Sequence, residues 1–301
     1  VLLLAAELVL RIWGTGGPPS PVGEFHPRLG WSLEPGRTYR LPAPPAGART
    51  TYRVAPDGMR AVPGEADELS LLLLGGAPAL GLGVDRPVSF AGRLETLLRE
   101  RGLPLRVRAG GGDHYGLGQL LLWFRERGAK LRPALVVLVL DQLALRPLVE
   151  ERWRGWPKPR FALPAAKGMQ PVNLPLAPPE RPLLALLALV GGGPEKGGDG
   201  AVLPGGHAVL LRERPPATRR AWRLARGLLG ELRREVRLAG GLLLALAWPE
   251  PFQLRGEEVH RLAAAWGVEV DELFCDLASM GLADLCRAQG VEWVATVGPF
   301  R

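Results

Sequence analysis

Side chains able to do acid–base chemistry gather in two short stretches of this chain. Asp113 and His114 are adjacent in "AGGGDHYG", and Asp141 follows the apolar run "LVVLVL". A histidine flanked by carboxylates can serve as a general base or as a metal ligand. Since no nucleophile accompanies these residues, a hydrolytic site built from them would have to activate water. We favour the simpler interpretation, in which a lone histidine in a glycine loop makes local hydrogen bonds.

A third stretch has the pattern of a reactive turn but carries no reactive side chain. Leu71 to Asp85 reads "LLLLGGAPALGLGVD", so a run of leucines ends in Gly75 and Gly76 and is followed by Ala77. Glycine permits the sharp bend that such a turn needs at the end of a buried strand. A methyl group cannot attack a carbonyl. The turn therefore says more about the fold than about the activity.

The sequence gives no sign of a metal or cofactor site. Cys275 and Cys286 have no CxxC or histidine spacing, and we interpret them as buried free thiols, with pairing as the alternative outside the cytoplasm. "GGGPEKGG" resembles a phosphate loop, but Lys196 is followed by Gly197 instead of Ser or Thr. The four histidines are scattered along the chain: His26, His114, His207 and His260. We expect no cofactor and no metal.

From Leu69 onward, short apolar runs alternate with amphipathic helical patterns. Strands are predicted over 69–76, 103–107, 133–140, 241–248 and 291–297. Helices are predicted from an N-cap at Asp85 to Gly102, over 116–131, 217–240 and 257–266, and over a segment containing both cysteines. This alternation predicts an α/β protein, a three-layer α/β/α sandwich with a parallel sheet. Function collects beyond the carboxyl ends of such strands, where Ala77, the glycines before Asp113, and Asp141 would lie.

The remaining segments predict the domain organisation. Residues 1–13, "VLLLAAELVLRIW", are shorter than the about 20 apolar residues that span a bilayer. Because a Gly/Pro linker follows, we interpret them as a truncated membrane anchor or signal segment, with a short packed amphipathic helix as the alternative. Residues 14–65 are predicted to be a Pro/Gly-rich arm on the main domain, 66–301. That domain carries a long Pro/Gly-rich insertion at about 146–216, a length typical of lids and binding loops.

The chain has a formal net charge of +8, which raises the question of a nucleic-acid partner. The positive charge is almost entirely arginine, and it is interleaved with glutamate along amphipathic segments such as "ATRRAWRLARGLLGELRREVRLAG". That pattern is typical of a solvated helix face, and no aromatic-and-basic ladder accompanies it. We expect no nucleic-acid partner.

Four short motifs, in order, resemble the SGNH (GDSL) hydrolase superfamily in its bacterial membrane-anchored form. They are "FHPRLGWSLEPGRTYR" with "YRVAPDGMR", then "LLLLGGAPALGLGVDRPVSFAGRLETLL", then "RAGGGDHYGLGQ", then "RPALVVLVLDQL". The resemblance covers about Phe25 to Leu143 and continues more loosely to "LLLALAWPEP". It implies the same α/β/α sandwich, in an SGNH-hydrolase or flavodoxin-like arrangement.

The resemblance also assigns site positions, most of them without the family's chemistry. Family members hydrolyse esters or transfer acyl groups with a Ser nucleophile, oxyanion donors that include a Gly and an Asn, and a terminal Asp–His pair. The Ser position falls on Ala77 and the preceding Asp on Gly76. The oxyanion Gly falls on Gly111, or on Gly110 if the alignment shifts by one. The Asn falls on Asp141, whose carboxylate accepts hydrogen bonds where an amide would donate them. No Asp-x-x-His motif ends the sequence.

These correspondences imply a catalytically degenerate esterase or acyl-hydrolase relative. We expect a pseudoenzyme tethered outside the cytoplasmic membrane by its N-terminal segment, with an envelope carbohydrate or an envelope protein as its partner. The alternative is an active ester hydrolase or acyltransferase on envelope carbohydrate, with a rearranged site at Asp113, His114 and Asp141.

Overall fold

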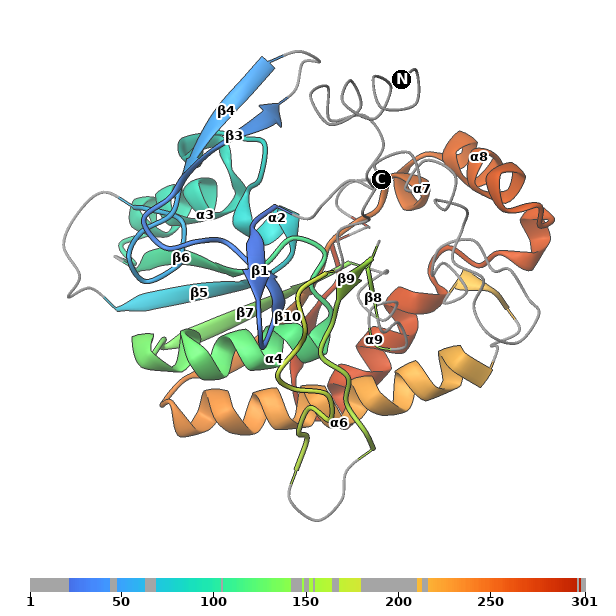
Figure 1. The fold of residues 1–301 in the computed structure, drawn as a ribbon. Helices are drawn as coiled ribbons and strands as arrows, with labels where there is room; N and C mark the ends of the chain where they lie inside the picture. The colour runs from blue at the N-terminus through green and yellow to red at the C-terminus, as the bar shows by residue number, and fades with distance from the viewer. Residues whose placement is uncertain are drawn as a thin grey trace, which may run out of the picture.

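The computed structural model describes residues 22–43, 48–62, 69–103, 105–141, 148, 152–153, 155–163, 168–179, 210–212, 216–296 and 298 (Figure 1). Its centre is a five-stranded parallel sheet in the order β11-β10-β7-β5-β6. The strands are β5 (Ser70–Gly75), β6 (Arg106–Gly111), β7 (Leu135–Leu140), β10 (Leu242–Ala247) and β11 (Glu292–Val294). The predicted parallel α/β sheet is thus confirmed.

Helices cover both faces of this sheet, which gives the predicted three layers. Figure 1 shows α4 and α6 side by side on one face, with α2 and α3 on the other. In β5, Leu72 and Leu74 pack into the core that holds α4, α6 and α9, while Leu71 and Leu73 pack toward α3. Burial on both faces explains the continuous apolar strands. The helices are α2 (Ala77–Leu80), α3 (Phe90–Glu100), α4 (Leu117–Glu126), α6 (Pro216–Leu238), α7 (Pro251–Leu254), α8 (Gly256–Trp266) and α9 (Leu277–Ala288).

The strand order explains why the helices divide unequally between the faces. From β5 the chain steps to β6 at one end of the sheet, then returns across to β7, β10 and β11. Right-handed crossovers place helices on opposite faces when the direction of stepping reverses. α3 therefore lies on one face, and α4, α6 and α9 lie on the other. Numbered along the chain, the order is the flavodoxin-like one, with its switch point between β5 and β7.

The second strand was predicted at the wrong position along the chain. "LPLRV", 103–107, was expected to end before the glycines, whereas β6 continues through them to Gly111. Glycine is required there by packing. A Cβ on Gly110 would lie 2.0 Å from the Trp123 ring, and one on Gly111 would lie 2.1 Å from the Gly75 carbonyl oxygen. These residues are strand glycines in close contact with their neighbours, not turn glycines.

Two finer predictions were also wrong. Asp85 does not cap α3: it accepts a hydrogen bond from the Thr50 hydroxyl and precedes a 3₁₀ turn, Arg86–Val88. The N-cap is Ser89, whose Oγ accepts from the Gly92 N–H at 3.2 Å. Cys286 lies in α9 but Cys275 precedes it, and both are free thiols. Further 3₁₀ turns span Gly128–Leu131 and Val270–Glu272.

The described part of the N-terminal arm consists of two hairpins that pack on the sheet domain. They pair β1 (Glu24–His26) with β2 (Gly30–Ser32), and β3 (Thr38–Ala43) with β4 (Ala48–Arg53). Arg60 follows them and is buried, with its guanidinium 4.7 Å from the centre of the Tyr52 ring. It donates to the carbonyls of Gly81 at 2.9 Å and Val84 at 2.7 Å. The loop after α2 is therefore fixed from the arm.

The described part of the insertion packs against the arm and α4. It contains a short hairpin of β8 (Arg152–Trp153) and β9 (Trp156–Pro157). The Leu176 N–H donates to the Pro27 carbonyl at 2.7 Å, and Arg125 of α4 donates to the Met169 carbonyl at 3.1 Å. Trp153 of β8 stacks on His114, which follows β6, so the insertion supplies a side chain near the carboxyl edge of the sheet.

No helix within the described residues is long and apolar enough to cross a membrane. The predicted anchor, 1–13, lies outside those residues.

Candidate functional site

The switch point of the sheet gathers three of the predicted residues at one edge. Ala77 comes two residues after β5, Gly111 ends β6, and Asp141 directly follows β7. These three strands are neighbours in the order β7-β5-β6, so their carboxyl ends lie side by side. In open α/β sheets, ligands bind in the crevice at this point.

The turn after β5 keeps its backbone requirements and has room for larger side chains. A Cβ on Gly75 would lie 2.8 Å from the Val139 carbonyl oxygen, so this position excludes a side chain. At Gly76, the N-cap of α2, a Cβ would meet nothing closer than 3.9 Å. Ala77 begins α2 and is half-buried. The Asp and Ser that the family resemblance would place at Gly76 and Ala77 are therefore absent, although Gly76 has space for a side chain.

Gly111 is the strand-end glycine next to this turn. It pairs with Gly75 in the parallel register and has a φ of +121°. Gly110 lies one residue deeper, beside Trp123 of α4 in the core. Of the two glycines considered from the sequence, Gly111 is the one at the carboxyl end of its strand.

Asp113 and His114 form a pair held by the arm and the insertion. His114 Nε2 lies 3.7 Å from Asp113 Oδ1, and the imidazole stacks on Trp153 of β8 with ring centres 4.3 Å apart. His114 also has a φ of +55°, which is uncommon for a residue other than glycine. The Asp113 carboxylate accepts from the Val22 N–H at 3.3 Å, and its carbonyl accepts from Trp31 Nε1 at 2.7 Å. The imidazole is about half exposed.

Asp141 has an acidic neighbour that sequence reasoning missed. The Trp248 N–H donates to the Leu140 carbonyl at 2.7 Å, which extends the pairing of β10 with β7 and brings Glu250 toward Asp141. Burial, and secondarily the charge of Asp141, raise the pKa of the Glu250 carboxyl to about 7. The stretch "LLLALAWPEP" could have indicated Glu250, because this carboxylate follows a strand of the parallel sheet and so lies at its carboxyl edge.

Glu250 is held by hydrogen bonds at the start of α7. Its N–H donates to Gln253 Oε1 at 3.1 Å. The buried Gln253 amide in turn donates to Asp276 Oδ1 at 3.0 Å. The backbone that carries Glu250 is thereby tied to the turn before α9.

The edge can therefore accept hydrogen bonds and move protons, but among the residues that the structure describes the turn after β5 carries no nucleophile. The Thr296 hydroxyl donates to the Ala247 carbonyl, and the Tyr115 hydroxyl donates to the Trp31 carbonyl. Burial raises the pKa of the Cys286 thiol to about 12, so this thiol is not a nucleophile near neutral pH. Within the described ranges, no three His, Cys, Asp or Glu side chains are placed to hold a metal ion.

Comparison with known proteins finds similarity only among solved structures. No family model matches the sequence, and no curated protein matches it. An acetyl xylan esterase, AlAXEase, is similar at 8% identity and a TM-score of 0.41, over 77% of this chain and 79% of that chain. TesA is similar at 13% and 0.38, over 74% and 76%. AlinE4, an SGNH-hydrolase family esterase, is similar at 15% and 0.37, over 77% of both chains. Because these similarities are distant, the functional assignment depends on the residues at the carboxyl edge.

Proposed function

We propose that this chain is a catalytically degenerate, SGNH-hydrolase-like domain of the cell envelope that binds carbohydrate at the carboxyl edge of its sheet without hydrolysing esters. The observation that carries the proposal is Ala77. At the start of α2, where the family resemblance requires a hydroxyl, the chain presents a methyl group beside intact strand-end glycines. A serine mechanism cannot begin there.

The charges at the edge favour a neutral, hydroxyl-rich ligand. Asp113, Asp141 and Glu250 all lie at or near it. An ionised carboxylate only accepts hydrogen bonds, and Glu250, whose pKa is raised to about 7, is ionised in only part of the molecules near neutral pH. The ionised carboxylates would repel an anionic ligand or an oxyanion, whereas sugar hydroxyls can donate to them. The half-exposed His114 ring adds a flat surface, supported from behind by Trp153. An acetylated envelope carbohydrate is the class that the resemblance suggests.

Hydrolysis is tested with 4-nitrophenyl acetate, a generic activated ester. We expect no turnover above buffer for the unmodified chain, and none for Ala77→Ser, because Asp141 replaces the amide donor. Turnover that disappears with His114→Ala but survives in His260→Ala, a matched change on the exposed face of α8, would overturn the proposal.

Binding is tested by calorimetry with O-acetylated and deacetylated envelope oligosaccharides. Asp141→Asn should weaken binding by roughly tenfold or more, since hydrogen bonds to charged groups contribute about 1.5–3 kcal/mol. Ala77→Phe should obstruct the carboxyl edge beside β5. The control is Asp284→Asn, an exposed aspartate of α9. Equal affinity for all three variants and the unmodified chain would contradict carbohydrate binding at this edge.

A second candidate function is suggested by the raised pKa of Glu250. A carboxyl that titrates near pH 7 can act as a general base toward water, with Asp141 and the Asp113–His114 pair at the same edge. This rearranged hydrolase requires ester turnover that rises with pH through about 7 and is lost in Glu250→Gln.

A further inference from the structure

The amino-terminal edge of the sheet, opposite the candidate site, exposes a row of leucines. Leu69, Leu103 and Leu242 precede or begin β5, β6 and β10, and their exposed fractions are 69%, 51% and 70%. Backbone hydrogen bonds fix two of them at the edge: the Leu69 carbonyl accepts from Arg106, and the Leu242 N–H donates to Ala134. Leucines scattered singly on a surface need no explanation, but several along one edge do.

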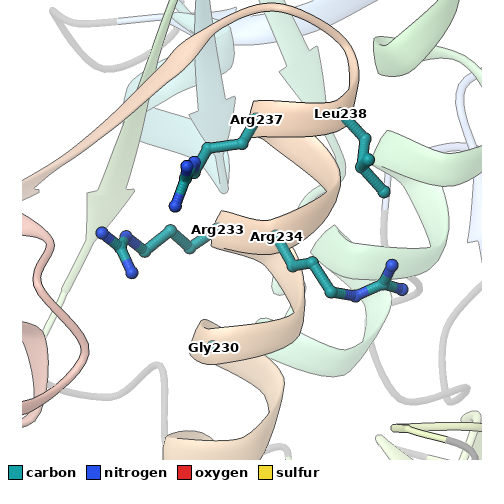
Figure 2. A pocket seen from close by; sticks show the side chains of 5 residues that line it. All are labelled: Gly230, Arg233, Arg234, Arg237 and Leu238. Carbon is teal, nitrogen blue, oxygen red and sulfur yellow. The ribbon is translucent and has the colours of Figure 1, made fainter.

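The C-terminal end of α6 extends this edge with a fourth leucine and a cluster of arginines. Leu238 is 74% exposed and is joined to β10 by a short turn. Together with Gly230, Arg233, Arg234 and Arg237, it lines a hollow of about 390 Å³. Figure 2 shows Arg233 and Arg237 extending to the same side of the helix and Arg234 to the other.

Arg233 and Arg237 carry charge that the described acids do not neutralise. Arg234 pairs with Glu231 at 2.7 Å, but within the described ranges neither Arg233 nor Arg237 has an ion-pair partner. The Arg233 guanidinium lies 3.2 Å from the position a Cβ would take on Gly290, in the turn before β11. The pair therefore borders the same edge as the leucines.

Further cations surround the row. Arg101 follows α3, and Lys130 and Arg132 precede β7; all three are exposed or half-exposed. Among the described residues, Glu100 ends α3 and Glu292 begins β11, and these two acids reduce the positive charge of the edge without cancelling it. A basic residue in the last turn of a helix is commonly explained by the helix dipole. That explains Arg237 alone, and it explains none of the leucines.

We propose that the amino-terminal edge binds the surface of an anionic phospholipid bilayer. Arg233 and Arg237 take a headgroup phosphate between them, and the leucines enter the boundary between headgroups and acyl chains. This combination distinguishes a bilayer from other polyanions, because nucleic acid offers no apolar layer for exposed leucines. The strength of binding to a membrane surface depends both on the apolar area that is buried and on electrostatic attraction to anionic lipid. The proposal concerns the opposite edge from the candidate carbohydrate site and does not depend on it.

The test is co-sedimentation of the full 301-residue chain with two kinds of vesicle, phosphatidylcholine alone and phosphatidylcholine mixed with phosphatidylglycerol. The readout is the preference for anionic vesicles, which removes any contribution from an apolar N-terminal segment common to all variants. Arg233→Gln with Arg237→Gln should reduce this preference by roughly 30-fold, since each cation near an anionic surface contributes about 1 kcal/mol. The preference should also fall with added salt.

Two further variants make the result specific. Arg49→Gln with Arg53→Gln removes the same charge from exposed positions of β4 and should leave the preference nearly unchanged. Leu238→Ser with Leu242→Ser should weaken binding to both kinds of vesicle. Thermal unfolding by circular dichroism checks that each variant is folded.

Three results would overturn the proposal. One is an anionic preference that the two arginine pairs reduce equally. Another is no preference at all, with an oligonucleotide bound instead through Arg233 and Arg237. The third is self-association of the chain that Leu238→Ser with Leu242→Ser abolishes while vesicle binding is unchanged, because the edge would then be an interface between copies.

Discussion

Replacing Gly111 by alanine should destabilise the fold much more than the same change at Gly76, the neighbouring glycine at the carboxyl edge. The new Cβ would lie 2.1 Å from the Gly75 carbonyl oxygen, where backbone on both sides is held in the sheet. Residue 111 would also have to keep a φ of +121°. Backbone strain contributes about 1–3 kcal/mol and overpacking about 1–3 kcal/mol, so we expect a loss of about 4 kcal/mol in the free energy of unfolding.

Two other glycines separate these contributions. Gly36 has a φ of +77° and no atom within 4 Å of the position a Cβ would take, so Gly36→Ala should show backbone strain alone, about 1 kcal/mol. Gly76 has a φ of −85° and open space, so Gly76→Ala should change stability by less than about 1 kcal/mol. Urea unfolding followed by tryptophan fluorescence measures all three. If Gly111→Ala were as stable as Gly76→Ala, the strand-end glycine would not be needed for the close approach of β5 and β6.

The remaining predictions concern buried polar groups. Burial raises the pKa of Glu250 from 4.5 to about 7, so its protonated form stabilises the fold below pH 4.5 and that contribution is lost as the pH rises through about 7. Urea unfolding across this range should show the stability of the unmodified chain, relative to Glu250→Gln, falling by on the order of 3 kcal/mol; a constant difference would contradict the raised pKa. Arg60→Met should cost about 2–4 kcal/mol, because it leaves the Gly81 and Val84 carbonyls without their donor; a cost equal to that of exposed Arg49→Met would show that they are satisfied otherwise. Trp31→Phe should cost about 1–3 kcal/mol through loss of the donation to the Asp113 carbonyl, measured in the same way. Unchanged stability there would mean that this hydrogen bond contributes nothing.

The sheet could be predicted from sequence because its strands are buried on both faces. A continuous run such as 135–140 has few alternatives to a central parallel strand, and the amphipathic stripe of α6 is equally distinct. The end of β6 could not be predicted in this way. Its glycines look like a turn locally, and only the approach of Gly75 and Trp123 from other elements explains them.

The sequence indicates where the candidate site lies, but it does not identify every residue there. The positions of Ala77 and Asp141 follow directly from the ends of strands that the sequence indicates, whereas Gly111 was expected in the loop after the second strand and instead ends β6. Glu250 depends on which strand lies beside β7, and the exposed leucines depend on which end of each strand faces solvent. Both features depend on how the strands are arranged in the sheet, and a local sequence pattern does not determine that arrangement.

The contacts around His114 join segments that are far apart in the chain. The Trp31–Asp113 hydrogen bond spans 82 residues, and the bond from Gln119 Nε2 to the Leu29 carbonyl spans 90. Closing such long loops is slow compared with forming local contacts, so the arm should dock late in folding. The backbone amides around Asp113 should then exchange with solvent through partial openings that release β1 and β2, well before the sheet itself opens. Any ligand that holds His114 in place would also slow the exchange of the arm, about ninety residues earlier in the sequence.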